Sequence, residues 1–174
     1  MALISAFTII RAISLFHLTA AFIFLTAPRM ISDQNVVFVL GESLRLPHVT
    51  SLDKPNEASA FIAIILAFLG LADLTAASLN EDTAIEYWLS NVPMRLMFLF
   101  SLTGYVYLFK DDGLLGRRSV GKAGPGETLR NSMVFTFGFM ETVTWFWIFT
   151  SLREERRERS KKRLEKLRAQ DNTL

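Results

Sequence analysis

The stretch that decides the fold is residues 58–79, ASAFIAIILAFLGLADLTAASL, in which Asp73 is the single ionisable side chain. A bilayer core about 30 Å thick is crossed by about 20 mainly apolar residues in helical conformation. Three further segments approach that length and composition, at residues 3–27, 93–109 and 133–150. The sequence therefore predicts an all-α, polytopic membrane protein with four transmembrane helices.

The segments between these spans carry their own signals. Residues 36–46 are apolar at first but too short to cross, which predicts an interfacial or re-entrant helix. Residues 80–89 begin with a capping asparagine and predict a separate short helix. Asn91 is expected to cap the third span, with Pro93 in its first turn. The glycine-rich residues 110–130 predict a flexible loop.

Large aromatic side chains lie near the ends of two predicted spans. Tyr87 and Trp88 precede the third span, and Trp145 and Trp147 lie near the end of the fourth. Tyrosine and tryptophan are enriched where a membrane meets water, because their rings are apolar and carry one polar group. The pattern therefore predicts interfacial aromatic belts.

The charge is concentrated at the end of the chain. We divide the sequence into a transmembrane domain at 1–151 and a basic tail at 152–174. Nine of the 19 Lys and Arg residues follow Thr150, and their spacing with Glu residues favours an exposed, charged C-terminal helix. The tail has no aromatic side chain for base stacking, so we expect no nucleic-acid partner. Contact with anionic membrane lipids is the first expectation, and docking of a soluble partner is the alternative.

The distribution of positive charge predicts the orientation. Four spans place both termini on one side of the membrane. The loops on the opposite side hold eight basic residues, namely Arg29, Arg45, Lys54, Lys110, Arg117, Arg118, Lys122 and Arg130. The tail holds nine and residues 79–91 hold none. The positive-inside rule thus favours cytosolic termini.

Each predicted span contains one strongly ionisable residue: Arg11, Asp73, Arg95 and Glu141, two of each sign. A lone charge near mid-bilayer costs about 3 kcal/mol on insertion scales, so we expect pairing. Asp73 lies late in the second span and Arg95 early in the third, which brings both toward one membrane face. Arg11 and Glu141 each lie about nine residues into their spans by the sequence count and are expected to meet near the midplane.

Three interpretations of these charges stay open. The ion pairs can fix how the helices pack, as buried polar groups in membranes commonly do. Alternatively, Glu141 and Asp73 can line a proton or cation path that Arg11 and Arg95 tune, or an Arg can bind a lipid headgroup. His17 is expected to be a satisfied core or interfacial histidine. Small residues in the second span, from Ser59 to Ala76, predict close approach of another helix.

The composition offers little catalytic chemistry. The chain has no cysteine, so disulfides, thiol catalysis and Cys-ligated zinc are excluded. Its two histidines, His17 and His48, are too few and too far apart to suggest a metal site. We therefore expect no catalytic residues, no metal and no cofactor, and a protein that is not an enzyme.

Short motifs along most of the chain resemble a fungal family, the increased loss of mitochondrial DNA proteins, which are small four-span membrane proteins. They are, in order, Arg11 in the first span, Leu46-Pro47 before the second, Asp73 near its end, Val92-Pro93-Met94-Arg95-Leu96 opening the third, Glu141 in the fourth, and Arg153-Glu154-Glu155 after it. Their order and spacing carry the resemblance, which extends to about residue 160.

The resemblance implies a location in the endoplasmic reticulum membrane and a link to maintenance of mitochondrial DNA. We therefore expect a non-enzymatic, multi-pass subunit or adaptor that supports membrane homeostasis and, indirectly, the mitochondrial genome. The alternative function is a small transporter or channel-like protein that uses the intramembrane charges. Four short helices enclose little volume, so membership in a larger membrane protein complex or a homo-oligomer is expected.

Overall fold

The computed structural model describes residues 4–110, 113–115 and 126–171, and all regular structure within them is helical. Its elements are α1 (Ala6–Thr26), α2 (Arg29–Ser32), α3 (Asn35–Leu44), α4 (Glu57–Ala76), α5 (Glu81–Phe109), the 3₁₀ helix η2 (Glu127–Leu129) and α6 (Ser132–Asp171). Helices α1, α4, α5 and α6 are long and apolar enough to cross a membrane. The predicted all-α class is confirmed.

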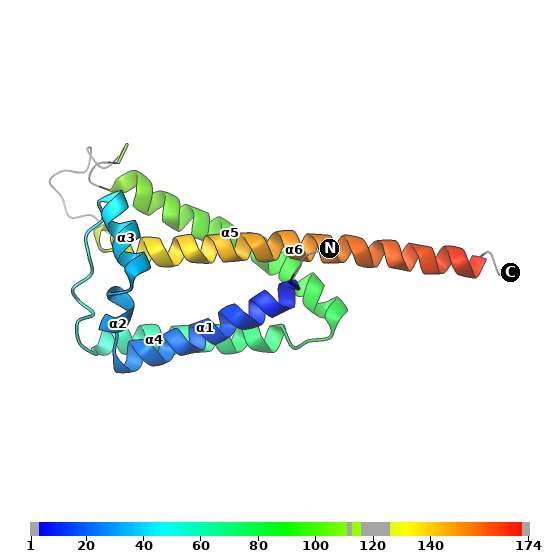
Figure 1. The fold of residues 1–174 in the computed structure, drawn as a ribbon, viewed down its shortest axis with the longest axis horizontal. Helices are drawn as coiled ribbons and strands as arrows, with labels where there is room; N and C mark the ends of the chain where they lie inside the picture. Colours follow the sequence, from blue (N-terminus) through cyan, green and yellow to red (C-terminus); the bar gives the residue numbers. More distant parts are fainter. Residues whose placement is uncertain (1–3, 111–112, 116–125, 172–174) are drawn as a thin grey trace.

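The four long helices form two pairs, α1 with α4 and α5 with α6 (Figure 1). Each pair has a point of close approach at a glycine. A Cβ added to Gly70 of α4 would lie 2.8 Å from the carbonyl oxygen of Ser14 in α1. A Cβ added to Gly138 of α6 would lie 2.8 Å from the methyl carbon of Thr103 in α5. Small side chains thus let the helices of each pair approach closely.

Helix α3 lies against the start of α6 at one end of the molecule (Figure 1). A Cβ on its Gly41 would lie 2.6 Å from the Cβ of Ser132, so the two backbones are in close contact. The opposite side of α3 exposes Phe38 and Val39, which are 61% and 57% exposed. A short helix with exposed apolar side chains fits the predicted interfacial position.

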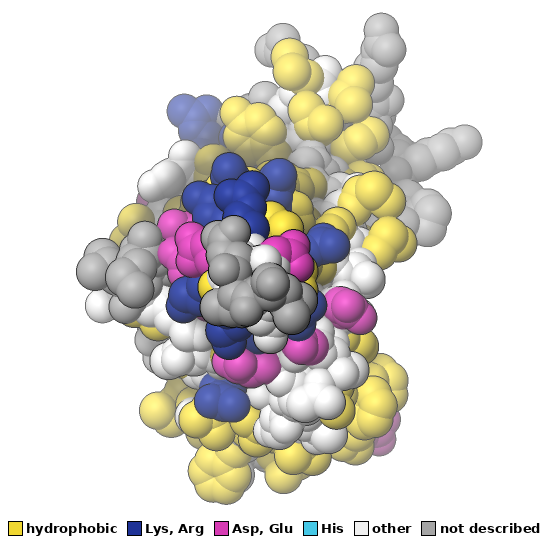
Figure 2. All heavy atoms as spheres, turned by 90° about the vertical axis from the view of Figure 1, so that its right-hand side faces the viewer, with side chains coloured by type: hydrophobic (Ala, Val, Ile, Leu, Met, Phe, Trp, Pro, Cys, Tyr) yellow, Lys and Arg dark blue, Asp and Glu magenta, His cyan; other side chains and the backbone are white. Residues whose placement is uncertain are grey.

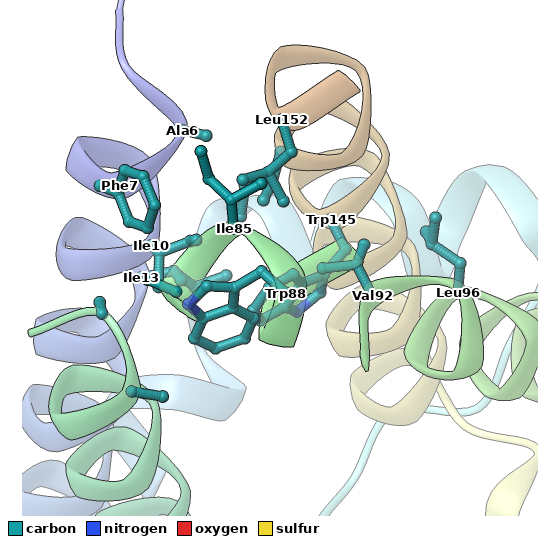
Figure 3. Packing of buried hydrophobic residues seen from close by; sticks show 14 of the residues in the cluster. Ala6, Phe7, Ile10, Ile13, Ile85, Trp88, Val92, Leu96, Trp145 and Leu152 are labelled. Carbon is teal, nitrogen blue, oxygen red and sulfur yellow. The ribbon is translucent and has the colours of Figure 1, made fainter. Parts of the chain in front are cut away.

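The main hydrophobic core lies where the two helix pairs meet, near the N-terminus (Figure 3). Trp88 of α5 lies between the labelled residues of α1 and Trp145 of α6, and the two indole rings stack with centroids 5.4 Å apart. Trp88 is 0% and Trp145 1% exposed. These two tryptophans are therefore core residues, whereas Tyr87 and Trp147, the other members of the predicted interfacial belts, are exposed.

Helix α5 is longer than the predicted third span, because it begins at Glu81 and continues through Pro93. Asn80 caps it by accepting a hydrogen bond from the amide of Thr83. The predicted separate short helix and the cap at Asn91 are therefore wrong. Proline inside a helix costs about 3 kcal/mol. The part of α5 before Pro93 buries Ala84, Ile85 and Trp88 in the core, and this burial offsets the cost of the proline.

Helix α6 has 40 residues and is therefore about 60 Å long. The charged tail is thus a continuation of the fourth long helix, and it extends beyond the other helices in Figure 1. The backbone amide of Ala6 donates to Glu155 of the tail over 2.8 Å. This contact places the start of α1 beside the tail, at the same end of the bundle. Most of the predicted 110–130 loop lies outside the described residues.

Candidate functional site: two buried polar bridges

The first bridge joins α4 to α5. Asp73 is 1% exposed, and its carboxylate accepts two hydrogen bonds from the Arg95 guanidinium, at 2.7 Å from Nη1 and 2.5 Å from Nη2. This geometry is the bidentate arrangement in which an arginine and a carboxylate interact most strongly. The predicted pairing of these two residues is confirmed.

Further contacts hold the Arg95 side chain in place. Its Nε donates to the side-chain oxygen of Asn91, one turn earlier in α5, over 2.6 Å. Its guanidinium carbon lies 4.5 Å from the ring centroid of Trp145 and 5.3 Å from that of Trp88. Cations are attracted to the faces of aromatic rings, and more so where water is excluded. The guanidinium therefore has a carboxylate, an amide and two indoles as partners.

The second bridge joins α1 to α6. Nε2 of His17 lies 2.9 Å from Oε1 of Glu141, and the indole N–H of Trp145 donates to Oε2 over 2.8 Å. His17 is 0% and Glu141 5% exposed. Both carboxylate oxygens thus have a partner. The other ring nitrogen of His17, Nδ1, is buried and has no partner among the described residues.

Arg11 takes no part in the second bridge, so its predicted pairing with Glu141 is wrong. The Arg11 guanidinium donates instead to the carbonyl oxygen of Ala77, at 3.3 Å. The buried side of α1 carries Ile10, Ser14 and His17, and Arg11, one residue after Ile10, is exposed. The predicted depth is wrong as well as the side of the helix, because His17 lies at the level of Glu141, whereas Arg11, six residues earlier, lies beside the end of α4.

Trp145 connects the two bridges. Its N–H binds Glu141, while its ring face lies against the guanidinium of Arg95. Each bridge joins one helix of the α1/α4 pair to one helix of the α5/α6 pair. The arrangement can therefore lock the two pairs together in a single register. Within the described ranges, no group of three or more His, Cys, Asp and Glu side chains could hold a metal ion.

Buried hydrogen bonds and an ion pair between four long apolar helices define an all-helical membrane protein held together by buried polar contacts. Residues 4–162 match the family described as Increased loss of mitochondrial DNA protein 1, and the chain belongs to that family. No solved structure gives a significant match.

Two fungal relatives support the assignment. The chain is 30% identical over 165 residues to Protein ilm1 of Schizosaccharomyces pombe, and the match covers 91% of each chain. It is 26% identical over 147 residues to Protein ILM1 of Saccharomyces cerevisiae, covering 84% of this chain and 64% of the relative.

Proposed function

We propose that this protein is a non-enzymatic, multi-pass protein of the endoplasmic reticulum membrane, acting as a subunit or adaptor. In this role it supports membrane homeostasis and, indirectly, the maintenance of mitochondrial DNA, the process to which the family name refers. The observation that carries the proposal is how the buried polar groups are used. Both oxygens of Asp73 bind Arg95 of the neighbouring helix. One oxygen of Glu141 binds His17 of another helix, while the other binds Trp145 of its own helix.

The distal tail supports the adaptor role. Leu164 and Leu167 lie three residues apart on α6, beyond the apolar part of the helix, and are 56% and 58% exposed. Residues three apart share a face of a helix, so the pair offers a small apolar contact to a partner. Cationic side chains surround it, which favours a partner with acidic groups.

The first test is a pull-down of the full chain in mild detergent, read by mass spectrometry. We expect a reproducible membrane-protein partner that is lost from a chain truncated after Leu152 and from the Leu164→Ser, Leu167→Ser variant. A matched control is Leu114→Ser, which removes an exposed leucine from the other end of the molecule. Recovery of this chain alone under every condition would contradict the adaptor role.

Location and phenotype need separate measurements. Fluorescence microscopy of the tagged full chain is expected to show the endoplasmic reticulum. Cells lacking the protein are expected to lose mitochondrial DNA, measured as copy number, and to regain it on expression of the wild-type chain. A mitochondrial location would argue for a direct role instead of the indirect one proposed.

A transporter is the second candidate function, and one observation favours it. The His17–Glu141 pair can exchange a proton, because each side chain has a charged and a neutral form, and His17 keeps one ring nitrogen without a partner among the described residues. Proton flux into vesicles containing the wild-type chain, abolished by Glu141→Gln in a folded protein, would support this candidate over the adaptor.

A further inference from the structure

The tail half of α6 presents two different faces. One face is held against the rest of the protein by ion pairs. Arg159 binds Glu81 over 2.7 Å, and Arg163 binds Asp82 over 2.7 Å. Glu155, on the same side, accepts from the amide of Ala6. These contacts fix how the helix is rotated about its axis.

The neighbouring face carries four basic residues within a stretch of about two and a half turns: Arg153, Arg156, Arg157 and Lys161. At about 100° per residue they span an arc of about 140°, which adjoins the ion-paired face at Arg156. Among the residues that the structure describes, none of the four takes part in an ion pair. Seen from the C-terminal end, Lys and Arg side chains gather around α6 in Figure 2.

These four side chains line a shallow hollow of about 450 Å³ together with Leu89 of α5 and Ser160. Leu89 packs against the main hydrophobic core, and Leu152, which directly precedes Arg153, is a fully buried member of that core. The hollow therefore begins at the level where the apolar core ends. Its apolar wall comes from α5 and its cationic wall from α6.

The depth of the hollow fits the headgroup layer of a membrane. This layer is about 5–8 Å thick on each side of the hydrocarbon core. Because a helix rises 1.5 Å per residue, Arg153 to Arg157 cover about 6 Å along the axis, and Lys161 lies about 6 Å further out. With Leu152 at the edge of the hydrocarbon core, the three arginines would fall within the layer that contains lipid phosphates.

We propose that Arg153, Arg156, Arg157 and Lys161 form a binding site for the phosphomonoester headgroup of an anionic membrane lipid. Arginine matches phosphate through paired N–H donors. A phosphomonoester offers three oxygens and carries a charge of about −1.5 to −2 at neutral pH. A phosphodiester headgroup carries one negative charge on its phosphate, so four clustered cations select the monoester. The site rests on the proposed membrane crossing of α6 and is independent of the adaptor role.

The test uses the purified full chain in neutral detergent and native mass spectrometry with added phosphatidic acid, phosphatidylserine or phosphatidylcholine. The site variant is Arg153→Gln, Arg156→Gln, Arg157→Gln. The matched control, Lys162→Gln, Lys166→Gln, Arg168→Gln, removes the same charge from the same tail outside the hollow. Circular dichroism and membrane fractionation establish that each variant folds and inserts, which tests the membrane crossing separately.

We expect the wild type to bind phosphatidic acid at least fivefold more tightly than phosphatidylserine, and the control to keep that preference. The site variant should lose it, while a variant with lysine at the same three positions keeps part of it. Equal losses in the site and control variants would overturn the proposal, because they indicate a diffuse electrostatic effect. Competition by glycerol 3-phosphate as effective as that by phosphatidic acid would overturn the lipid assignment.

If the site variant fails to fold, photocrosslinking of the wild type decides the question. A photoreactive phosphatidic acid is expected to label residues 153–161 or Leu89. Labelling confined to other parts of the chain would overturn the proposal.

Discussion

The two polar bridges connect the same helix pairs but differ in chemistry. Asp73–Arg95 joins α4 to α5 through a bidentate ion pair whose arginine is always charged. His17–Glu141 joins α1 to α6 through one histidine nitrogen, and the histidine is charged only when protonated. Arg95 has an amide and two indoles as additional partners, whereas one nitrogen of His17 has none among the described residues.

The difference indicates separate contributions to stability. Breaking a buried ion pair leaves an uncompensated charge, which costs about 3–5 kcal/mol. A single side-chain hydrogen bond between membrane helices contributes about 0.6–2 kcal/mol. We therefore infer that Asp73–Arg95 contributes more to the free energy of unfolding, and that His17–Glu141 determines how α1 packs against α6.

The largest effect is expected from Arg95→Met, which keeps an unbranched stem but removes the guanidinium and leaves Asp73 buried without a cation. We expect a loss of about 3–5 kcal/mol in unfolding free energy, measured by denaturation of the purified chain in detergent. Asp73→Asn should cost less, because Arg95 keeps Asn91 and both indoles.

The double variant Asp73→Asn, Arg95→Met is the control for this prediction. It should be more stable than Arg95→Met alone, since it removes the orphaned charge. If the loss of unfolding free energy in the double variant equals the sum of the two single losses, the two residues are energetically independent. The first bridge would then not stabilise the contact between α4 and α5.

The next effect tests the α1/α4 contact on which the second bridge depends. Gly70→Ala places a methyl group against the Ser14 carbonyl oxygen, which belongs to the backbone and cannot turn away. It should cost about 1–3 kcal/mol and displace His17, which is on α1. Gly138→Ala, the matched control, meets side-chain atoms alone, of Thr103 and Leu102, and should cost less. Equal melting temperatures for the two variants would contradict this reading.

A smaller effect is expected from Glu141→Gln. The amide keeps the size of the side chain but only one acceptor oxygen, so it serves both partners only if the Trp145 N–H keeps that oxygen and Nε2 of His17 accepts from the amide NH2. We expect a loss of about 1 kcal/mol and a change in tryptophan fluorescence. Glu86→Gln, an exposed position on α5, is the control. A loss as large as that of Arg95→Met would mean that the two bridges do not differ in strength.

The smallest effect is expected from Arg11→Gln, which removes a single 3.3 Å hydrogen bond from an exposed guanidinium. The change in unfolding free energy should stay within about 0.5 kcal/mol. A loss of stability as large as that of Glu141→Gln would instead support the pairing of Arg11 with Glu141 that the sequence predicts.

The fold and the first bridge could be predicted from the sequence because they depend on position along the chain. Hydropathy locates the spans, and the short turn between α4 and α5 brings Asp73 and Arg95 to similar depths. The second bridge depends on which side of α1 faces inward. In a membrane helix the lipid-facing and buried sides are equally apolar, so composition does not distinguish them.

One signal could have identified His17. It is aligned with Ile10, Ile13 and Ser14 at helical spacing, whereas Arg11 is six residues from His17 and points in a different direction. The start of α5 was predicted wrongly at Pro93, again because packing in the core cannot be read from the local sequence. Local preference favours a helix start there, but burial of Trp88 and Val92 on the continuous helix outweighs that preference.

Because α6 is one continuous helix, the number of residues in it determines the direction in which its C-terminal half points. One residue inserted between Trp145 and Glu155 would turn everything beyond it by about 100° and advance it by about 1.5 Å. Arg159 and Arg163 would then face away from Glu81 and Asp82. An insertion of seven residues, nearly two full turns, would restore the direction but not the height. This part of the chain should therefore tolerate changes in side chains far better than changes in length.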